Sequence, residues 1–366
     1  DHADVFCTTE EGVKGKRAVE WRLVDEAVPN TRLDQAVAAR AREFAAQSDR
    51  PSGAKGIALT PLDVRASADS RSYKYVSVEF ARPERLVTIT LRGPGAPPLA
   101  DAEAMVAQGA GFWPLALARE LDDAILDIRL NEFDTAVIVF KSEGDPAAVL
   151  AYDAFLDRHK DHWLAREIRL KWKRVLKRVD LTSRSLVALI EPGSCFAGTL
   201  AELIFAADRS YMLVGRHDGD NRPPAAIALS QANFGRYPTA NGITRLQSRF
   251  LADGGAVERA RASIGTMLDA EAAEALGLVT FAPDDIDWED EIRLFLEERA
   301  SFSPDALTGM EANLRFGGPE TMESKIFARL TAWQNWIFQR PNAVGEEGAL
   351  KRYGTGQKPA FDTKRV

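Results

Sequence analysis

Glu202 has the clearest potential for chemistry in this sequence of 366 residues. It follows a loop of small residues, 193–201, that leads from an apolar segment into a helix-like one. Such a turn at the start of a helix leaves backbone N–H groups free to bind an anion or a developing oxyanion. Glu202 could therefore act as an acid or base. The alternative, which we favour, is a structural glutamate satisfied by a nearby arginine or backbone N–H.

Other reactive side chains give weaker signals. Cys195 could be a thiolate nucleophile beside a helix start, but no histidine lies near it in sequence, so a buried loop residue is favoured. His159 and His162 have a spacing compatible with a metal site, yet the charged residues around them are typical of a solvated helix start. Residues 218–221 resemble a calcium loop without its register or closing glutamate, and we expect a surface turn. No metal or cofactor is predicted.

The composition limits the class of protein. Apolar residues make up 45% and charged residues 28%, as in an ordinary globular protein. With 47 Lys and Arg against 54 Asp and Glu, the net charge of −7 argues against a nucleic-acid partner. No apolar run approaches the ~18 residues of a membrane span, so no membrane association is expected. Two cysteines cannot form a disulfide framework, which favours a cytoplasmic protein.

Apolar periodicity predicts the elements that must position Glu202. Short alternating or continuous apolar segments read as strands, and longer segments with an apolar stripe read as helices. The predicted strands are 75–80, 86–91, 136–140 and 185–190, and the predicted helices between them are 116–130 and 163–179. Alternation of this kind predicts an α/β fold with parallel crossover connections.

Two stretches of the sequence resemble each other. Residues 18–29 and 273–283 each read as a short helix, then Leu-Val, then an extended step into proline, and a long amphipathic helix follows each. We expect duplicated modules, the first of them mostly upstream of Asp1. The predicted organisation is 1–50 as the helical tail of the first module, 51–72 as a linker, 73–283 as a divergent second module, and 284–366 as a C-terminal helical and dimerisation region.

The ordered set of motifs over residues 73–361 resembles the crotonase (enoyl-CoA hydratase/isomerase) superfamily. The matching motifs are the small-residue loop with Glu202-Leu203, residues 229–235, 238–246 and 273–279, and the ending 346–348 with 358–361. The resemblance implies a crotonase-like ββα spiral, α/β in class. It also implies two functional positions, at which this sequence departs from the family. The second family glutamate is replaced by Gln231, which cannot exchange a proton near neutral pH. The oxyanion-hole glycine is replaced by Thr199.

Within the superfamily, the chain resembles the ring-opening enzymes of aerobic benzoate degradation. The features that carry this resemblance are the duplication, the aromatic helix 333–340 and the C-terminal ending. That resemblance implies an epoxidised or dihydroxylated dihydrobenzoyl-CoA as substrate, opened to an unsaturated aldehyde acyl-CoA and formate. It implies catalytic glutamates upstream of residue 1, and therefore a mainly structural role for this part in a homodimer joined by its C-terminal helices.

The resemblance to the superfamily also implies that residues of the tail lie near the acyl-CoA: Arg340, Lys351 and Lys358, with Arg352 beside them. The basic run 166–178 could guide a polyanionic CoA, although the solvated back of a helix is favoured. Two alternatives stay open. One is an enoyl-CoA hydratase or isomerase that uses Glu202 in the second module. The other is a non-catalytic interaction protein that keeps only the fold.

Overall fold

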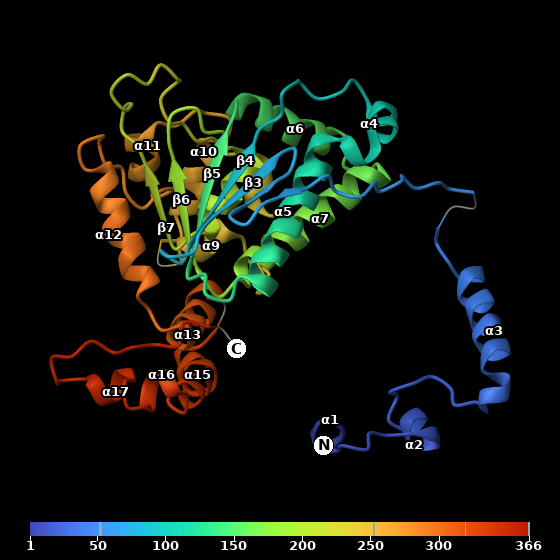
Figure 1. Cartoon of the computed structure of the whole chain (residues 1–366). Helices are drawn as coiled ribbons and strands as arrows, with labels where there is room; N and C mark the ends of the chain where they lie inside the picture. The colour runs from blue at the N-terminus through green and yellow to red at the C-terminus, as the bar shows by residue number, and fades with distance from the viewer. Residues whose placement is uncertain (51–52, 252, 319, 365–366) are drawn as a thin grey trace. The chain divides into compact units, whose positions relative to one another are not determined.

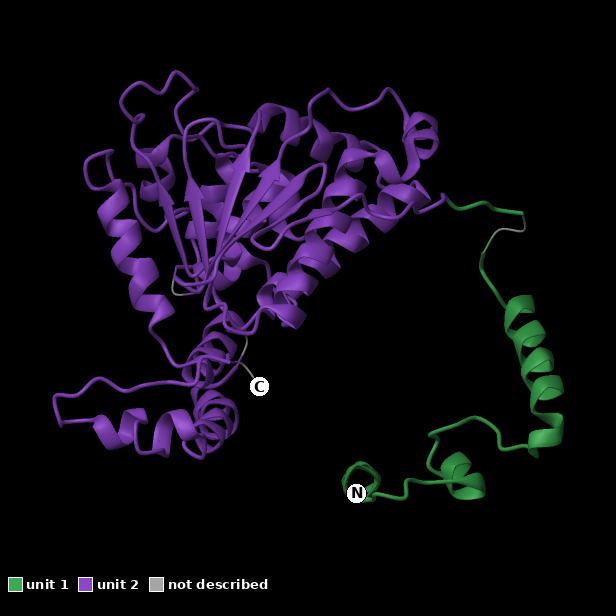
Figure 2. Ribbon diagram, in the orientation of Figure 1, with its two compact units in different colours: residues 1–56 green, residues 57–366 purple. Residues whose placement is uncertain are grey.

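A computed structural model of the chain describes residues 1–50, 53–251, 253–318 and 320–364. The chain divides into two units, Asp1–Gly56 and Ile57–Val366 (Figure 2). The sequence placed a linker at 51–72, of which residues 51 and 52 lie outside the described residues. Strands β1 (Arg65–Ala66) and β2 (Ser70–Ser72) lie inside that range, so the sheet begins before the predicted second module.

Unit 1 is a short series of helices, and its described residues form no hydrophobic core of their own. Its elements are α1 (His2–Thr8), α2 (Gly15–Glu20), η1 (Asn30–Arg32) and α3 (Leu33–Ala46). Among its described residues only Ala18 is a buried apolar residue, and large apolar side chains of α3 are exposed. The stripe of α3 thus lies open within unit 1, where a surface helix normally packs such a stripe against a core.

Unit 2 is built on one seven-stranded sheet in the order β1 to β7 (Figure 1). After β1 and β2 come β3 (Val76–Ala81), β4 (Leu86–Arg92), β5 (Val137–Glu143), β6 (Ser185–Ile190) and β7 (Arg209–Met212). The strands from β1 to β4 pair antiparallel and those from β4 to β7 pair parallel. The predicted strands and the parallel crossovers are confirmed.

Helices cover both faces of the sheet. On one face α5 (Trp113–Asn131) and α7 (Trp163–Asp180) contribute to the large core with Ile89, Phe140 and Leu186. On the other face α12 (Trp288–Ala300) packs Trp288, Ile292 and Phe295 against a smaller core from β5 to β7. All six residues of β6 are buried, as expected of a central parallel strand between two layers.

Short helices fill the connections and the C-terminal region. The connections hold α4 (Ala102–Gln108), η2 (Gly109–Gly111), α6 (Pro146–Arg158), η3 (Gly198–Ala201), α8 (Glu202–Ala206), η4 (Gln231–Phe234), α9 (Arg245–Arg249), α10 (Ala256–Ala262) and α11 (Ala270–Ala275). The C-terminal region holds α13 (Pro304–Arg315), α14 (Met322–Ser324), the π-helical turn η5 (Lys325–Leu330), α15 (Thr331–Ile337), α16 (Pro341–Val344) and α17 (Ala349–Arg352).

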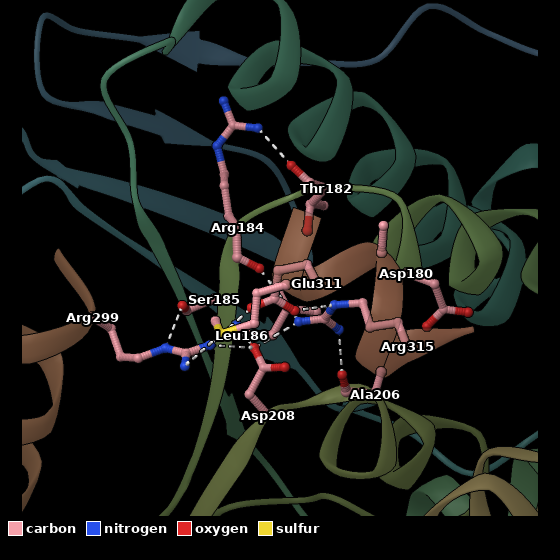
Figure 3. A network of polar contacts seen from close by, with 12 residues as sticks. Asp180, Thr182, Arg184, Ser185, Leu186, Ala206, Asp208, Arg299, Glu311 and Arg315 are labelled. Carbon is pink, nitrogen blue, oxygen red and sulfur yellow. Dashed lines mark hydrogen bonds and ion pairs between the residues drawn. The ribbon is translucent and has the colours of Figure 1, made fainter. Parts of the chain in front are cut away.

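A polar network joins α13 to α12 and to Asp208, the residue before β7 (Figure 3). Arg315 bonds Asp208 at 2.7 Å and Glu311 at 2.7 Å, and Arg299 of α12 bonds Glu311 at 2.8 Å. Arg315 also donates to the carbonyl of Ala206, at the C-terminal end of α8. Cations at the end of a helix are favourable, because the last carbonyls lack helical partners.

Within the described residues, none of the helices has the length and apolar character that crossing a bilayer requires.

Candidate functional site

The small-residue loop after β6 turns at Gly198 and leads through η3 into α8. Gly198 has φ +47°, a conformation that favours glycine. A Cβ at this position would lie 2.0 Å from a carboxylate oxygen of Asp153, so no other residue fits without displacing that side chain. Glu202 is the first residue of α8. The loop and the helix start therefore have the form that the sequence predicted, but with a second carboxylate packed against them.

Asp153 of α6 accepts a hydrogen bond from the backbone N–H of Thr199, in the loop that the sequence suggested could bind an anion. The Thr199 N–H donates to Asp153 Oδ2 at 2.8 Å, and the Thr199 hydroxyl donates to Oδ1 at 2.5 Å. Ser230 Oγ donates to Oδ2 at 2.7 Å, and Arg236 Nη1 lies 3.9 Å from Oδ1. Burial raises the pKa of Asp153, while Arg236 and these donors oppose the shift. An internal carboxylate therefore fills the place beside the Thr199 N–H at which an anion could otherwise bind.

Glu202 is sealed inside the module. Its side chain is 1% exposed, Oε1 accepts from Asn233 Nδ2 at 2.8 Å, and Oε2 accepts from Arg245 Nη1 at 3.0 Å. Arg245 also binds Asp180 at 2.6 Å. Burial raises the pKa of Glu202 to about 7, against the attraction of Arg245 and the hydrogen bond from Asn233. Both carboxylate oxygens are engaged, so proton exchange with a bound substrate would require this network to open.

Gln231, at the position of the second family glutamate, begins η4 and is exposed. At the positions of the two family glutamates the site thus has one buried carboxyl, Glu202, and one amide, Gln231, which are no acid and base pair. Cys195 is fully buried, and burial raises the pKa of its thiol to about 11, which disfavours a thiolate.

The residues with metal-like and calcium-like spacing have local structural roles, as the sequence favoured. His162 Nδ1 accepts from the Leu164 N–H as the N-cap of α7, and the His159 ring packs on Phe155. Asp220 binds Arg222 in a surface turn. Across the described ranges no group of three or more His, Cys, Asp or Glu residues could hold a metal ion.

Within the described residues Glu202 bonds Asn233 and Arg245 and none of the basic candidates. Arg340 lies 3.4 Å from Asp305 and over the ring of Trp336, while Lys351 and Lys358 are exposed. In α7, Lys171 and Arg178 bind Asp122. A role of the tail in substrate binding stays a prediction.

Sequence reasoning missed Asp153 and the part played by Arg245. Asp153 is a lone acidic residue among the buried apolar residues of α6, which include Val149, Tyr152 and Phe155. A charged residue on an apolar helix face is a usable signal, because such residues are almost never fully buried unless paired. Arg245 lies in residues 238–246, a segment that served only to identify the superfamily resemblance, so its bond to Glu202 was not predicted.

Comparison with known proteins gives one strong sequence relative. No family model matches the chain. Benzoyl-CoA-dihydrodiol lyase of Aromatoleum evansii is 50% identical over 366 residues, which is 100% of this chain and 65% of the relative. The chain therefore spans less than two thirds of that relative's length.

Solved structures give the fold. An enoyl-CoA hydratase from Geobacillus kaustophilus is similar with a TM-score of 0.56 and 17% identity, covering 80% of this chain and 98% of that one. Another from Bacillus anthracis has a TM-score of 0.54 and 17% identity, covering 80% and 100%. An enoyl-CoA hydratase/isomerase from Cupriavidus metallidurans has a TM-score of 0.53 and 19% identity, covering 81% and 98%. The chain has the crotonase fold, as the sequence predicted.

Proposed function

We propose that this chain, which has the crotonase fold and is related to benzoyl-CoA-dihydrodiol lyase, is part of a lyase that opens an oxygenated, dearomatised benzoyl-CoA ring. Water opens the ring of the epoxidised or dihydroxylated substrate, one carbon leaves as formate, and an unsaturated aldehyde acyl-CoA remains. Residues 73–283 act as scaffold, and the reacting glutamates belong to the part of the longer relative that this chain does not cover.

The main evidence for a scaffold role is the hydrogen bond between the Thr199 N–H and Asp153. Catalysis of this type depends on backbone N–H groups aimed at the developing oxyanion. Here the Thr199 N–H already donates to Asp153 at 2.8 Å, and Glu202 is bound by Arg245 and Asn233. A hydratase or isomerase reaction at Glu202 is less well supported, because substrate would have to displace one internal carboxylate and free another.

A repeated geometry supports duplicated modules. Helix α2 ends with Arg22 at φ +58°, and the Leu23 N–H bonds the Ala18 carbonyl at 2.9 Å. Helix α11 ends with Gly277 at φ +69°, and the Leu278 N–H bonds the Ala273 carbonyl at 2.9 Å. Both are the left-handed helix ending with a bond that spans the last turn.

The number of positions that separates Arg22 from Gly277 also separates equivalent residues of the two helices that follow, α3 and α12. It matches Leu33 of α3 to Trp288 of α12, and Val37 to Ile292. In unit 2 these positions pack on the sheet, whereas in unit 1 they are exposed. We therefore assign residues 1–50 as the tail of a preceding module whose sheet lies outside this chain.

The C-terminal region is the proposed dimer contact. Segments α14, η5 and α15 contain no buried residue among the positions described, and Met322 and Phe327 are 70% and 77% exposed. An apolar surface of this kind suits a second copy of the protein. Arg340, Lys351 and Lys358, beside it in sequence, are the proposed contacts of the acyl-CoA.

An activity assay tests the proposal. The chain 1–366 and the longer protein that contains it are each incubated with the oxygenated dihydrobenzoyl-CoA, and formate release is measured. We expect formate from the longer protein and none from 1–366. Formate released by 1–366 alone would contradict the scaffold role, and its absence from both would contradict the substrate class.

Two further assays address the alternatives. Turnover of crotonyl-CoA by 1–366 that is lost in Glu202→Gln would favour a hydratase in the second module. Calorimetry of the longer protein with CoA thioesters addresses the non-catalytic alternative, since thioester binding speaks against a purely structural protein.

A further inference from the structure

A charged cavity lies beside the start of β7, between the second module and the C-terminal helices. It has a volume of about 290 Å³ and is lined by side chains from α7, α8, β7, α9, α12 and α13. Five of the lining residues are arginines: Arg209, Arg245, Arg249, Arg299 and Arg315. Figure 3 shows Arg299, Arg315, Asp180 and Asp208, which belong to its wall. We call it the arginine cavity.

Three of the arginines are fully used by the fold. Arg245 binds Asp180 and Glu202, Arg315 binds Asp208 and Glu311, and Arg299 binds Glu311. These three guanidinium groups therefore have four carboxylates as partners. They hold the walls of the cavity in place.

Arg249 and Arg209 have no carboxylate partner within the part of the chain that the structure describes. Arg249 donates through Nε to the Gly277 carbonyl at 2.6 Å, and its two terminal nitrogens make no hydrogen bond to the described residues. Partial burial lowers the pKa of Arg249. The Arg209 guanidinium carbon lies 4.1 Å from the ring centroid of Phe295, another wall residue. Two cations thus line the cavity without a paired anion.

We propose that the arginine cavity binds a phosphate group, held by Arg249 and Arg209. Guanidinium forks match phosphate oxygens geometrically, and two forks offer more donors than one carboxylate ligand can accept. A volume of about 290 Å³ holds a phosphate and several waters, given that one water takes roughly 30 Å³. The phosphate can be free or carried by a CoA-type nucleotide. The inference does not depend on the proposed lyase activity.

Phosphate binding to the chain 1–366 is measured by calorimetry at constant ionic strength, with sodium chloride as the balancing salt. We expect saturable binding of inorganic phosphate, weakened about tenfold or more in Arg249→Gln and in Arg209→Gln, because each removes a charge-assisted bond. The matched control is Arg259→Gln, an exposed arginine of α10 paired with Asp253, which keeps the wild-type affinity. Circular dichroism and the thermal midpoint establish that each variant is folded. If one of the two cavity variants does not fold, the other alone tests the proposal.

Coenzyme A and dephospho-CoA are then compared as competitors. Displacement of phosphate by CoA and not by dephospho-CoA identifies the 3′-phosphate as the bound group, and no displacement by either identifies free phosphate; both support the site. Absence of phosphate binding, or equal affinity in wild type and both cavity variants, overturns the proposal. Neither result bears on formate release, so failure here is distinct from failure of the lyase proposal.

Discussion

Residues 15–46 and 270–300 have the same order of helices, but only the second region packs its long helix against a sheet. In each, a short helix ends in a left-handed residue, Arg22 or Gly277, and a longer helix follows. In α12 Trp288 is 4% exposed, whereas in α3 Leu33 is 48% exposed. Local structure therefore forms from local sequence in both places, and only the sheet under α12 adds the burial that stabilises it.

The largest expected effect comes from removing the packing of α12. Trp288→Ala should lower the free energy of unfolding of unit 2 by about 3–5 kcal/mol, because it leaves a cavity against the sheet. Leu33→Ala, the matched change in α3, should alter it by less than about 0.5 kcal/mol. Urea denaturation of both variants measures the difference. Equal losses would break the comparison.

The packed residues 270–300 belong to unit 2, which also contains the Thr199 loop occupied by Asp153, and unit 1 has no counterpart of this loop among its described residues. Asp153→Ala should cost about 3 kcal/mol in urea denaturation, since it leaves the buried Thr199 and Ser230 donors without their acceptor and removes the ion pair with Arg236. Arg158→Ala on the same helix, where the side chain is exposed, is the control and should change the free energy of unfolding by less than about 0.5 kcal/mol. A mild effect of Asp153→Ala would show that the site is not tightly filled.

The two helix endings differ in their tolerance of a side chain. Gly277→Ala should destabilise unit 2 by about 2 kcal/mol, because φ is +69° and the new Cβ would lie 2.9 Å from the ring of Phe250. The thermal midpoint of the variant measures this loss. A neutral substitution would mean that the ending of α11 is not held by its surroundings.

The pH dependence of stability should also come from unit 2. The pKa of Glu202 is about 7 in the folded chain against an ordinary value of 4.5. Between these values the folded state binds more protons than the unfolded state, so this group's contribution is fully present below pH 4.5 and is lost by about pH 7. Urea denaturation of Glu202→Gln across that range should show a flatter profile, by at least about 1 kcal/mol. Glu43→Gln on α3 should follow the wild type.

The smallest effect is expected at Arg22. Its φ of +58° is unfavourable for a side chain, so Arg22→Gly should stabilise the ending of α2 by up to about 1 kcal/mol. Slower exchange of the Leu23 amide, by up to about fivefold, measures the gain. Faster exchange in the variant would contradict the equivalence with Gly277.

The sequence predicted the elements of this fold well because their signals are local. Strand 185–190 has the same bounds in the structure as in the prediction, and the long helices expected after residues 18–29 and 273–283 are α3 and α12. Strands β1 and β2 were missed, because two or three polar residues carry no periodicity and depend on pairing with β3.

The site was less predictable, because its contacts join distant parts of the chain. Glu202 and the loop could be identified from small residues before a helix. That Asp153 would fill the Thr199 donor depends on α6 packing against the loop, which no local pattern encodes. Arg245 reaches Glu202 in the same way, across the module.

Amide hydrogen exchange of α3 and α12, measured in the chain 1–366 and in the longer protein that contains it, tests most directly whether this chain completes a duplicated scaffold. We expect α12 to be protected in both proteins, and α3 to exchange freely in 1–366 and to be protected at least about 100-fold in the longer protein. Protection of α3 in the chain 1–366, or its free exchange in both proteins, would contradict the account.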